Sequence, residues 1–365
     1  MNLNRIIAYL RWRAFQTAAR LTLGERCSGW LFGRRVVTTP MTMRQHDEVE
    51  RAVEAEVLLA PAERCDYDFG PDYPQWFPRT AVFEPKRMFV ISSATIVPGS
   101  SAIVLRDGDI LERSLIGWEV FMQGGMFESM DKFRAVDGEE PVFPFPTYYA
   151  YYHELIEVMT ALLQCSKVHP ELRIALRKKR PAFVDGLLEF FGFDRKRWIE
   201  EDVPIKVKRC LHVPYVEHRS FVRPGDAEFL RGEILNRLGT TGAGRKIYIS
   251  RRGAPSRHLV NECELEDLLE KDGFEICRFE ALSVSEQFRK IAEADFVVAV
   301  HGSGLANLVA ARRGTRVLEI ISPEWRRSTF ARMSKELGLV YDWVMAETGN
   351  GGFTAPLDAI ATRVR

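Results

Sequence analysis

The residues best suited to do chemistry lie in the segment AVHGSGLANL, in the last third of the chain. An apolar run ends there and is followed by His301, Gly302, Ser303 and Gly304, after which a helix is predicted. Glycines let the backbone approach a ligand closely, and a helix start offers unpaired N–H groups at the positive end of its dipole. This pattern favours a diphosphate, with Ser303 as a hydroxyl donor and His301 able to reach the phosphate or the reacting group. A tight strand-to-helix turn without a ligand is the alternative.

Cationic side chains follow an earlier strand in the segment YISRRGAPSRHLVNE. Arg251 and Arg252 stand where that strand is predicted to end, and Arg257 comes shortly before the next predicted helix. Guanidinium groups suit a diphosphate because their planar forks donate paired hydrogen bonds and stay charged. Solvated arginines are also common in loops, so the motif gains its weight from sharing a sheet edge with HGSG.

A carboxylate, Glu319, stands near the end of the otherwise apolar strand RVLEIIS. An acidic residue in this position can accept both vicinal hydroxyls of a ribose, as in dinucleotide-binding folds. An ordinary salt bridge is the alternative. The ribose contact is favoured because the strand comes directly after the predicted phosphate-binding helix.

A histidine, His153, opens the predicted helix HELIEVMTALL in the first half of the chain. Helical spacing places Tyr152, Ile156, Met159 and Leu163 on one apolar face, and His153 beside that face rather than within it. A neutral imidazole in this position is suited to proton transfer near neutral pH.

The paired acidic residues Asp107 and Asp109, separated by Gly108, have the spacing of a metal-binding pair. They stand between two short apolar runs in a strand-like region over residues 88–116. Asp-Gly at such a place forms a hairpin turn because both residues tolerate positive φ. The sequence therefore predicts a turn here and no metal site.

The second half of the chain alternates helices with strands. Helices are predicted over residues 227–239, 261–273, 283–294, 304–314 and 325–338, and strands over 246–252, 274–280, 295–300, 316–322 and 339–345. Asn261 can cap one helix that Gly273 ends, and Ser283 with Glu286 forms a capping box. This alternation predicts an α/β fold with a parallel sheet covered by helices on both faces. Ligands bind such sheets beyond the carboxyl ends of the strands, where HGSG, Arg251 and Glu319 fall.

The length of 365 residues exceeds what one hydrophobic core usually supports, so two domains are expected. The Pro-containing segment from Val213 to Pro224 is the candidate linker. We therefore divide the chain into residues 1–35, 36–213 and 214–365, and expect that the last helix packs back on the middle segment.

Composition and charge restrict the class of partner. With 46% hydrophobic and 28% charged residues the chain is typical of a folded protein, and its net charge of +1 provides no field for nucleic acid. A small-molecule partner is expected, and nucleic acid is not.

The compartment is predicted from cysteines and apolar runs. The six cysteines lie far apart without a CxxC pair, which argues against a zinc or redox site and favours a reducing compartment. No run approaches the roughly 20 apolar residues of a membrane span, and no secretion signal is recognised. A cytoplasmic protein is expected.

Residues 1–35 are predicted to contain a basic amphipathic helix. Apolar residues near helical spacing alternate with arginines in MNLNRIIAYLRWRAF. Such a helix can lie peripherally on the inner face of a membrane, with arginines reaching anionic headgroups, or pack against the rest of the chain.

With these motifs in their order, the sequence resembles glycosyltransferase family 61. The resemblance is best from Lys246 to Tyr341, and a weaker one covers the helix of His153. It rests on the YISRR strand, Arg257 with Asn261 and Glu262, the Glu286–Gln287 pair, HGSGLAN with Asn307, and LEIISP.

The resemblance implies a GT-B fold of two facing Rossmann-like domains. Residues 36–213 would form the acceptor side and 214–365 the nucleotide-sugar-binding domain. It implies inversion at the transferred sugar with no essential metal and no cofactor. Donor-binding residues carried over are Arg251, Arg257, Asn261, Gln287, His301, Gly302, Ser303, Gly304, Asn307 and Glu319.

In such a mechanism a base deprotonates the acceptor hydroxyl while Arg251 and HGSG, including His301, stabilise the departing nucleotide diphosphate. His153 is the candidate base, with Glu154, Glu157 and Asp131 as alternatives. His153 could instead orient its helix or touch the donor phosphate.

The resemblance also implies a bacterial enzyme of surface-polysaccharide synthesis, such as capsule, lipopolysaccharide or exopolysaccharide. Its partners would be a nucleotide-sugar donor and a glycan or lipid-linked glycan acceptor. A non-catalytic sugar-nucleotide-binding or assembly protein is the alternative. A nicotinamide-dependent dehydrogenase is disfavoured because GxGxxG is missing after a strand.

Overall fold

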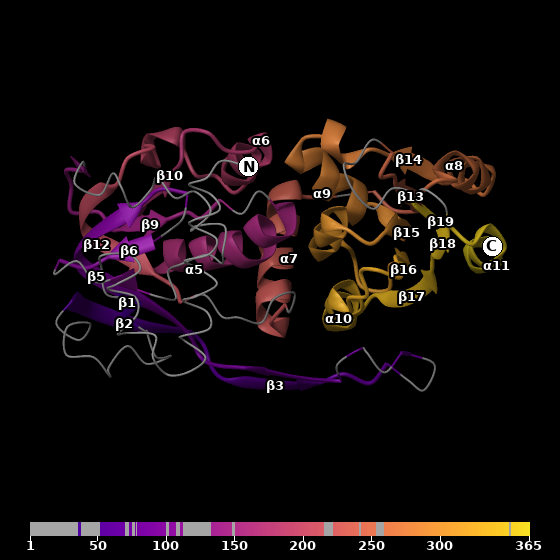
Figure 1. Cartoon of the computed structure of the whole chain (residues 1–365), viewed down its shortest axis with the longest axis horizontal. Helices are drawn as coiled ribbons and strands as arrows, with labels where there is room; N and C mark the ends of the chain where they lie inside the picture. The colour runs from indigo at the N-terminus through magenta and orange to yellow at the C-terminus, as the bar shows by residue number, and fades with distance from the viewer. Residues whose placement is uncertain are drawn as a thin grey trace.

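The structure is a computed structural model that describes residues 36–37, 52–69, 73–74, 77, 79–99, 102–106, 110–111, 133–147, 150–214, 222–240, 242–252, 259–349 and 352–365. The helix expected within residues 1–35, the turn at Asp107–Asp109, and Arg257 lie outside the described residues. Figure 1 shows two sheets at opposite ends of the molecule, with helices between them.

The first sheet is mixed, with the order β1-β7-β6-β5-β12-β9-β10-β11, while β2 pairs with β5 and β8 with β12. Its strands are β1 (Val36–Val37), β2 (Val53–Ala60), β5 (Lys86–Val97), β6 (Ala102–Val104), β7 (Ile110–Leu111), β8 (Arg134–Ala135), β9 (Val142–Pro144), β10 (Arg173–Leu176), β11 (Trp198–Glu200) and β12 (Ile205–His212). β5 runs antiparallel to β2, β6 and β12, whereas β9, β10 and β11 are parallel. Parallel pairing of the Rossmann type therefore covers only part of this sheet.

Strand β5 is apolar on both sides because both faces of the sheet are covered. Met88 and Val90 join the large core between the sheets, while Phe89 and Ile91 join a second cluster on the opposite face. The strand-like pattern predicted over residues 88–116 is confirmed in β5, β6 and β7.

The helix predicted around His153 is present, but its first part is a π-helix, η3 (His153–Met159), that continues as α5 (Thr160–Val168). The predicted apolar face is confirmed: Tyr152, Ile156, Met159 and Leu163 are all buried. Single π-helical turns inside α-helices are frequent at functional sites. Helix α6 (Ala182–Phe190) packs beside η3.

The second sheet is wholly parallel, as predicted, with the order β14-β13-β15-β16-β17. Its strands are β13 (Arg245–Ile249), β14 (Glu275–Cys277), β15 (Ala294–Val300), β16 (Arg316–Ile321) and β17 (Val340–Met345). Helices cover both faces, again as predicted. One face carries α7 (Pro224–Leu238), α9 (Val284–Ala292), η6 (Ser303–Ala310) and α10 (Thr329–Glu336); the other carries α8 (Glu262–Lys271) and α11 (Leu357–Val364).

Several local predictions can be compared with this half. The Ser283–Glu286 capping box is confirmed, and Gly273, at φ 82°, follows the end of α8. Asn261 is the N-cap residue of α8, as predicted, but its side chain makes no cap hydrogen bond and instead bonds Ala355. The helix predicted over 304–314 is a 3₁₀-helix, η6.

Two short strands and a helix follow β17, which was expected to be the last strand. They are β18 (Glu347–Gly349), β19 (Gly352–Thr354) and α11. We expected the last helix to pack back on the middle segment; the structure instead places α11 beside α8 on the outer face of the second sheet, where Ile360 and Val364 are buried.

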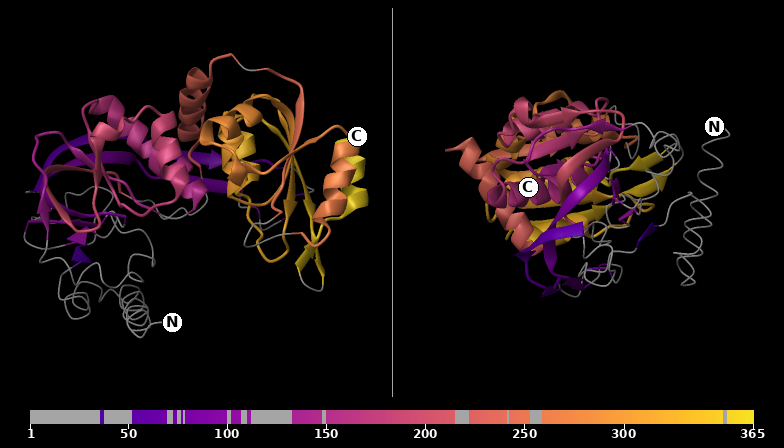
Figure 2. Two further views of the ribbon diagram at one scale, coloured as in Figure 1. Left: turned by 90° about the horizontal axis from the view of Figure 1, so that it is seen from above. Right: turned by 90° about the vertical axis from the view of Figure 1, so that its left-hand side faces the viewer.

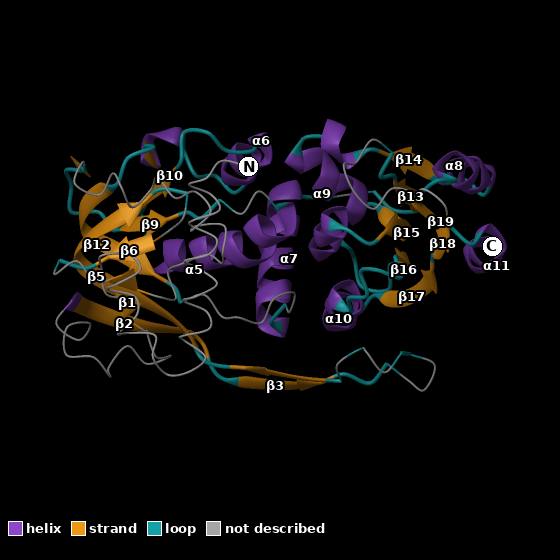
Figure 3. Ribbon diagram, viewed as in Figure 1, coloured by secondary structure: helices purple, strands orange, loops and turns teal. Residues whose placement is uncertain are grey.

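The helices of the two sheets share one core. A single cluster of buried residues includes Leu162 of α5, Leu187 of α6, Ile234 of α7 and Phe288 of α9. Figure 3 shows the resulting layers, with helices from both halves meeting between the two sheets. Helix α7 lies in this middle layer, and residues 215–221 of the expected linker lie outside the described residues.

A two-stranded arm, β3 (Glu63–Asp66) and β4 (Thr80–Phe83), extends from the first sheet toward the second. Figures 1 and 2 show it passing beneath the central helices toward β17. Within the described ranges, no helix is long and apolar enough to cross a membrane.

Candidate functional site

The carboxyl ends of β13 and β15 define the place where a ligand is expected. These strands are neighbours, but the chain leaves β13 toward β14 on one side and β15 toward β16 on the other. The reversal makes a topological switch point, where open α/β sheets bind ligands in the crevice between diverging loops. Arg251 follows β13 and His301 follows β15, so the two predicted motifs meet at this point.

Arg251 packs directly onto the HGSG segment. A Cβ atom on Gly302 would collide with Nη1 of the Arg251 guanidinium. A Cβ on Gly304 would lie 3.2 Å from Cγ2 of Ile249. Gly302 therefore leaves the space that the Arg251 guanidinium occupies at the start of η6, and Gly304 allows close packing of Ile249.

The backbone at Arg251 is held by a buried carboxylate. The Arg251 N–H donates to Oε1 of Glu262 at 2.6 Å, and the hydroxyl of Tyr248 donates to the same oxygen at 3.0 Å. Burial lowers the pKa of Arg251 from its ordinary value, but a guanidinium remains charged at neutral pH. The site thus contains a partly desolvated positive charge on a backbone that Glu262 holds.

Its neighbour Arg252 is placed differently. Arg252 bonds Oε2 of Glu266 at 3.1 Å, and half of its side chain is exposed. The two arginines of YISRR therefore separate into one that faces HGSG and one that forms a surface ion pair.

His301 is buried and oriented by Glu319. Nδ1 of His301 is hydrogen-bonded to Oε1 of Glu319, and the hydroxyl of Tyr341 donates to Oε2 of the same carboxylate. Glu319 has no exposed surface. A carboxylate that accepts Nδ1–H fixes the imidazole tautomer and leaves Nε2 to serve a ligand.

This placement gives Glu319 a role that differs from the predicted ribose contact. Both carboxylate oxygens are already engaged inside the protein. A ribose could bind Glu319 only if one of these hydrogen bonds were lost, and that contact stays a prediction.

Aromatic contacts lead from His301 to the helix of His153. The ring centroids of His301 and Phe330 are 5.2 Å apart, and those of Phe330 and Tyr152 are 6.0 Å apart. Tyr152 is the residue before His153. Nδ1 of His153 lies 3.0 Å from Oε2 of Glu157, and the His153 side chain is 29% exposed. A second histidine–carboxylate pair thus lies next to Tyr152, the residue that Phe330 connects to His301.

Asn307 and Gln287 belong to a buried hydrogen-bond chain. The hydroxyl of Tyr151 donates to Oδ1 of Asn307 at 2.8 Å, and Nδ2 of Asn307 donates to Oε1 of Gln287 at 3.2 Å. Gln287 then donates to the carbonyl of Phe279 at 2.8 Å. These residues connect η6 to α9 and to the first half of the chain, so their carry-over as donor contacts stays a prediction.

The remaining sequence candidates are more dispersed. Asn261 bonds both the N–H and the carbonyl of Ala355, at 2.8 and 3.0 Å, near the start of α11. Ser303 is half-buried as the first residue of η6, beside Gly302. Arg257 lies outside the described residues.

Sequence reasoning missed Tyr341, Tyr151 and Phe330, which hold or contact the predicted site residues. A usable signal was the alternation in LVYDWVM, because it places Tyr341 and Trp343 on one face of a strand beside Glu319. For Tyr151 and Phe330 the partner lies in another element, and local pattern provides no such signal.

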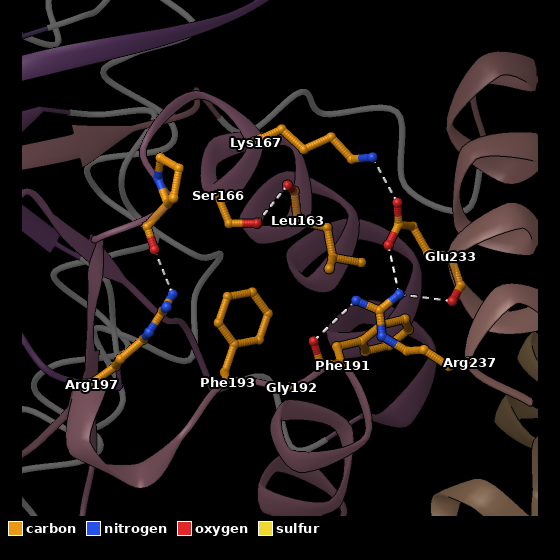
Figure 4. A pocket seen from close by; sticks show the side chains of 10 residues that line it. Leu163, Ser166, Lys167, Phe191, Gly192, Phe193, Arg197, Glu233 and Arg237 are labelled. Carbon is orange, nitrogen blue, oxygen red and sulfur yellow. Dashed lines mark hydrogen bonds and ion pairs between the residues drawn. The ribbon is translucent and has the colours of Figure 1, made fainter.

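No group of three or more His, Cys, Asp or Glu side chains is arranged to hold a metal ion within the part of the chain that the structure describes. The expectation of metal-independent chemistry stays a prediction. Two cavities lined by described residues lie away from Arg251 and His301. Figure 4 shows one of them, at the junction of α5 and α7.

Comparison with known proteins indicates which class of enzyme this site resembles. Residues 151–318 match the family model of Glycosyltransferase 61. The matched segment starts at Tyr151, contains His153, Arg251 and His301, and ends one residue before Glu319. The match supports the predicted resemblance and a glycosyltransferase enzyme.

Two curated relatives agree. Beta-1,2-xylosyltransferase RCN11 of Oryza sativa subsp. japonica is 34% identical over 130 residues, which are 31% of this chain and 24% of the relative. Beta-1,2-xylosyltransferase of Arabidopsis thaliana is 26% identical over 148 residues, which are 37% of this chain and 28% of the relative. The chain thus matches about a quarter of the length of these relatives.

Proposed function

We propose that this protein transfers a sugar from a nucleotide-diphosphate sugar to a glycan or glycolipid acceptor. The observation that carries the proposal is the packing of the Arg251 guanidinium onto Gly302, beside His301, at the switch point of a parallel sheet. The family match over the same segment supports it.

The donor side stabilises the leaving group. Arg251 supplies a desolvated positive charge, and the start of η6 supplies N–H groups and the hydroxyl of Ser303. Donors that are already oriented toward developing negative charge lower the barrier to departure of a diphosphate. Nε2 of His301, whose ring is held by Glu319 through Nδ1–H, is then an acceptor for a hydroxyl group of the sugar.

The acceptor side supplies the base. We assign this role to His153, which is partly exposed and carries Glu157 at Nδ1. The acceptor oxygen attacks the anomeric carbon while its proton passes to the imidazole. The bond between that carbon and the phosphate oxygen breaks, and its electron pair leaves with the nucleotide diphosphate. A single displacement of this kind inverts the anomeric centre and needs no metal.

The proposal includes a GT-B arrangement of the chain. Residues 36–213 would form the acceptor domain and 214–365 the donor domain, and the topology of the second sheet supports the latter. The proposal of a cytoplasmic bacterial enzyme of surface-polysaccharide synthesis rests on the family resemblance. The proposal that residues 1–35 lie peripherally on the inner membrane face rests on their basic amphipathic pattern.

Calorimetric titration with a panel of nucleotide diphosphates and their sugars tests the donor site. Arg251→Ala should weaken binding by about tenfold or more, because a charge-assisted hydrogen bond contributes about 1.5–3 kcal/mol. Arg252→Ala is the matched control, since its side chain is bound to Glu266 at the surface. It should bind like the wild type.

Transfer activity is then measured as release of nucleotide diphosphate from the donor that binds, with and without added glycan acceptors. His153→Gln should retain donor binding and lose acceptor-dependent release. A folded wild type that binds no member of the panel, or an Arg251→Ala variant that binds unchanged, would count against the transferase proposal.

A further inference from the structure

The arm formed by β3 and β4 makes contacts that the proposed chemistry does not yet use. Phe69, Tyr73 and Phe77 follow β3 and pack against β17, the edge strand of the second sheet. Phe77 is 1% exposed and lies in one cluster with Ile321 of β16 and Ala331 of α10. The arm therefore belongs to the packing of the second sheet, although its strands emerge from the first.

The arm is anchored at both ends. At its base, Arg223 donates to the carbonyls of Pro61, at 2.7 Å, and of Glu84. Farther along the arm, Lys335 of α10 donates to the carbonyl of Asp68 at 3.0 Å. These bonds fix the arm against two elements of the second half.

Tyr341 is the residue that the arm and the site share. The hydroxyl of Tyr73 donates to the backbone carbonyl of Tyr341 at 3.0 Å, and the two rings lie 6.4 Å apart. The side chain of Tyr341 has a different partner, because its hydroxyl donates to Oε2 of Glu319. Glu319 in turn holds Nδ1 of His301. Tyr341 thus links the arm, through its backbone carbonyl, to Glu319 and the imidazole, through its side-chain hydroxyl.

We propose that Tyr341 is a positioning residue for His301, and that the arm holds Tyr341 in place through Tyr73. By occupying Oε2 of Glu319, the Tyr341 hydroxyl leaves Oε1 to accept Nδ1–H, so that Nε2 faces the substrate with its lone pair. The proposal deepens the function proposed above and rests on it for the catalytic readout alone.

The electrostatics of Tyr341 fit this role. Burial and the adjacent Glu319 carboxylate raise the pKa of Tyr341 well above its ordinary value. The phenol therefore stays protonated and remains a donor throughout the working range of an enzyme. A phenylalanine in its place would leave Oε2 of a buried carboxylate without this donor, which weakens the arrangement in which Oε1 accepts Nδ1–H.

The ring nitrogens of His301 can be observed directly by NMR of the full chain labelled with ¹⁵N-histidine. At neutral pH the wild type should show the Nδ1–H tautomer for a ring signal that disappears in His301→Gln. Tyr341→Phe should lose this tautomer signature, and Tyr73→Phe should reduce it. A wild type in which His301 carries its proton on Nε2 would overturn the proposal without any variant.

Thr315→Val is the matched control. In the wild type, the buried hydroxyl of Thr315 donates to the carbonyl of Ala294 at 3.1 Å, at the end of the second sheet opposite to His301. It loses a buried hydrogen bond as Tyr341→Phe does, but it should keep the His301 signature. Loss of the signature in both variants would indicate a general effect of destabilisation and overturn the specific role of Tyr341.

Catalysis gives a second readout. Tyr341→Phe should lower kcat about tenfold, by analogy with the loss on removing the outer hydrogen-bond partner of a metal-bound histidine, with little change in donor affinity. An unchanged kcat together with an unchanged NMR signature would exclude the positioning role. If the wild type transfers no sugar, the proposed function fails, while the NMR comparison still decides whether Tyr341 positions His301.

Discussion

The guanidinium of Arg251 occupies the space that a side chain at position 302 would need. At the scale of single residues this explains the glycine better than backbone conformation does, because Gly302 has an extended φ of 171°. The cation and the glycine must therefore be considered together. A substitution of either residue should change the position of the positive charge at the start of η6.

Gly302→Ala should displace the Arg251 guanidinium from the site. The added methyl group meets the end of a flexible side chain that can move aside, so unfolding free energy should fall by at most about 1 kcal/mol. Nucleotide affinity should fall by about tenfold as the arginine moves. Urea unfolding and calorimetric titration measure the two effects.

Gly232→Ala provides the comparison for this variant. A Cβ at Gly232, within α7, meets no atom within 4 Å. This change should stabilise the protein by about 0.5–1 kcal/mol, because alanine favours a helix over glycine. Equal loss of nucleotide affinity in both variants would contradict the explanation for Gly302.

The sequence predicted which motifs would meet, but not how their side chains would pair. Parallel strands bring their carboxyl ends to one edge, so Arg251, HGSG and Glu319 could be placed together from strand order alone. Whether Glu319 contacts a ligand or His301 depends on side-chain direction across neighbouring strands. That depends on tertiary packing, as does the arrangement of Asn307 with Tyr151.

At the scale of elements, helices α5 and α7 are joined by an ion network around the largely covered carboxylate of Glu233. Figure 4 shows Glu233 of α7 between Lys167 of α5 and Arg237 of its own helix. The ion-pair distances are 2.7 and 2.6 Å, and the Glu233 side chain is 16% exposed. Burial raises the pKa of Glu233, but the hydrogen bonds and charges of Lys167 and Arg237 outweigh it and leave the pKa below 4.5.

Glu233→Gln should make the stability of the protein less sensitive to acid. A carboxyl group whose pKa is lower in the folded state stabilises the protein above its unfolded pKa, and this contribution is lost as pH falls through the folded pKa. At pH 7 the variant should lose about 1 kcal/mol of unfolding free energy, and below pH 4 the difference from wild type should shrink.

The measurement is urea unfolding at several pH values. Glu189→Gln is a suitable control, because Glu189 pairs with Arg195 while 53% of its side chain is exposed. Its unfolding free energy should change little at any pH. A Glu233→Gln variant with the acid sensitivity of the wild type would show that the network contributes no pH-dependent stability.

Elements of the second sheet were easier to predict than those of the first. The alternation of apolar strands with capped helices is a local pattern, and β13 to β17 follow it. Residues of the η3 region, of η6 and of the arm make contacts with distant segments. Local spacing cannot reveal such contacts; for example, Tyr151 bonds Asn307 across 156 positions.

At the scale of the whole molecule, one core extends through the helices of both halves. Residues of α5, α6 and α7 are buried in the same cluster as residues of α9 and η6. Unfolding either half alone would expose this shared apolar surface to water, at roughly 25 cal/mol for each Å². The two halves should therefore unfold together.

Hydrogen exchange followed by mass spectrometry in increasing urea should show peptides of β5 and β16 losing protection at the same denaturant concentration. Tyr151→Phe removes a hydrogen bond between the halves and should lower the unfolding free energy by about 1–3 kcal/mol. Both peptides should then lose protection at lower urea concentrations, and by the same shift. Protection that persists in β16 after β5 has opened would contradict the shared core as the unit of cooperativity.

The arm also has a consequence for solubility. β17 is the last strand of its sheet, and an uncovered edge strand is a template on which other chains can pair and aggregate. Tyr73 and Phe77 cover its aromatic residues Tyr341 and Trp343 with side chains from the same polypeptide. The arm thus protects the edge of the second sheet against pairing with a strand of another molecule. Loss of the arm would expose β17 and favour self-association.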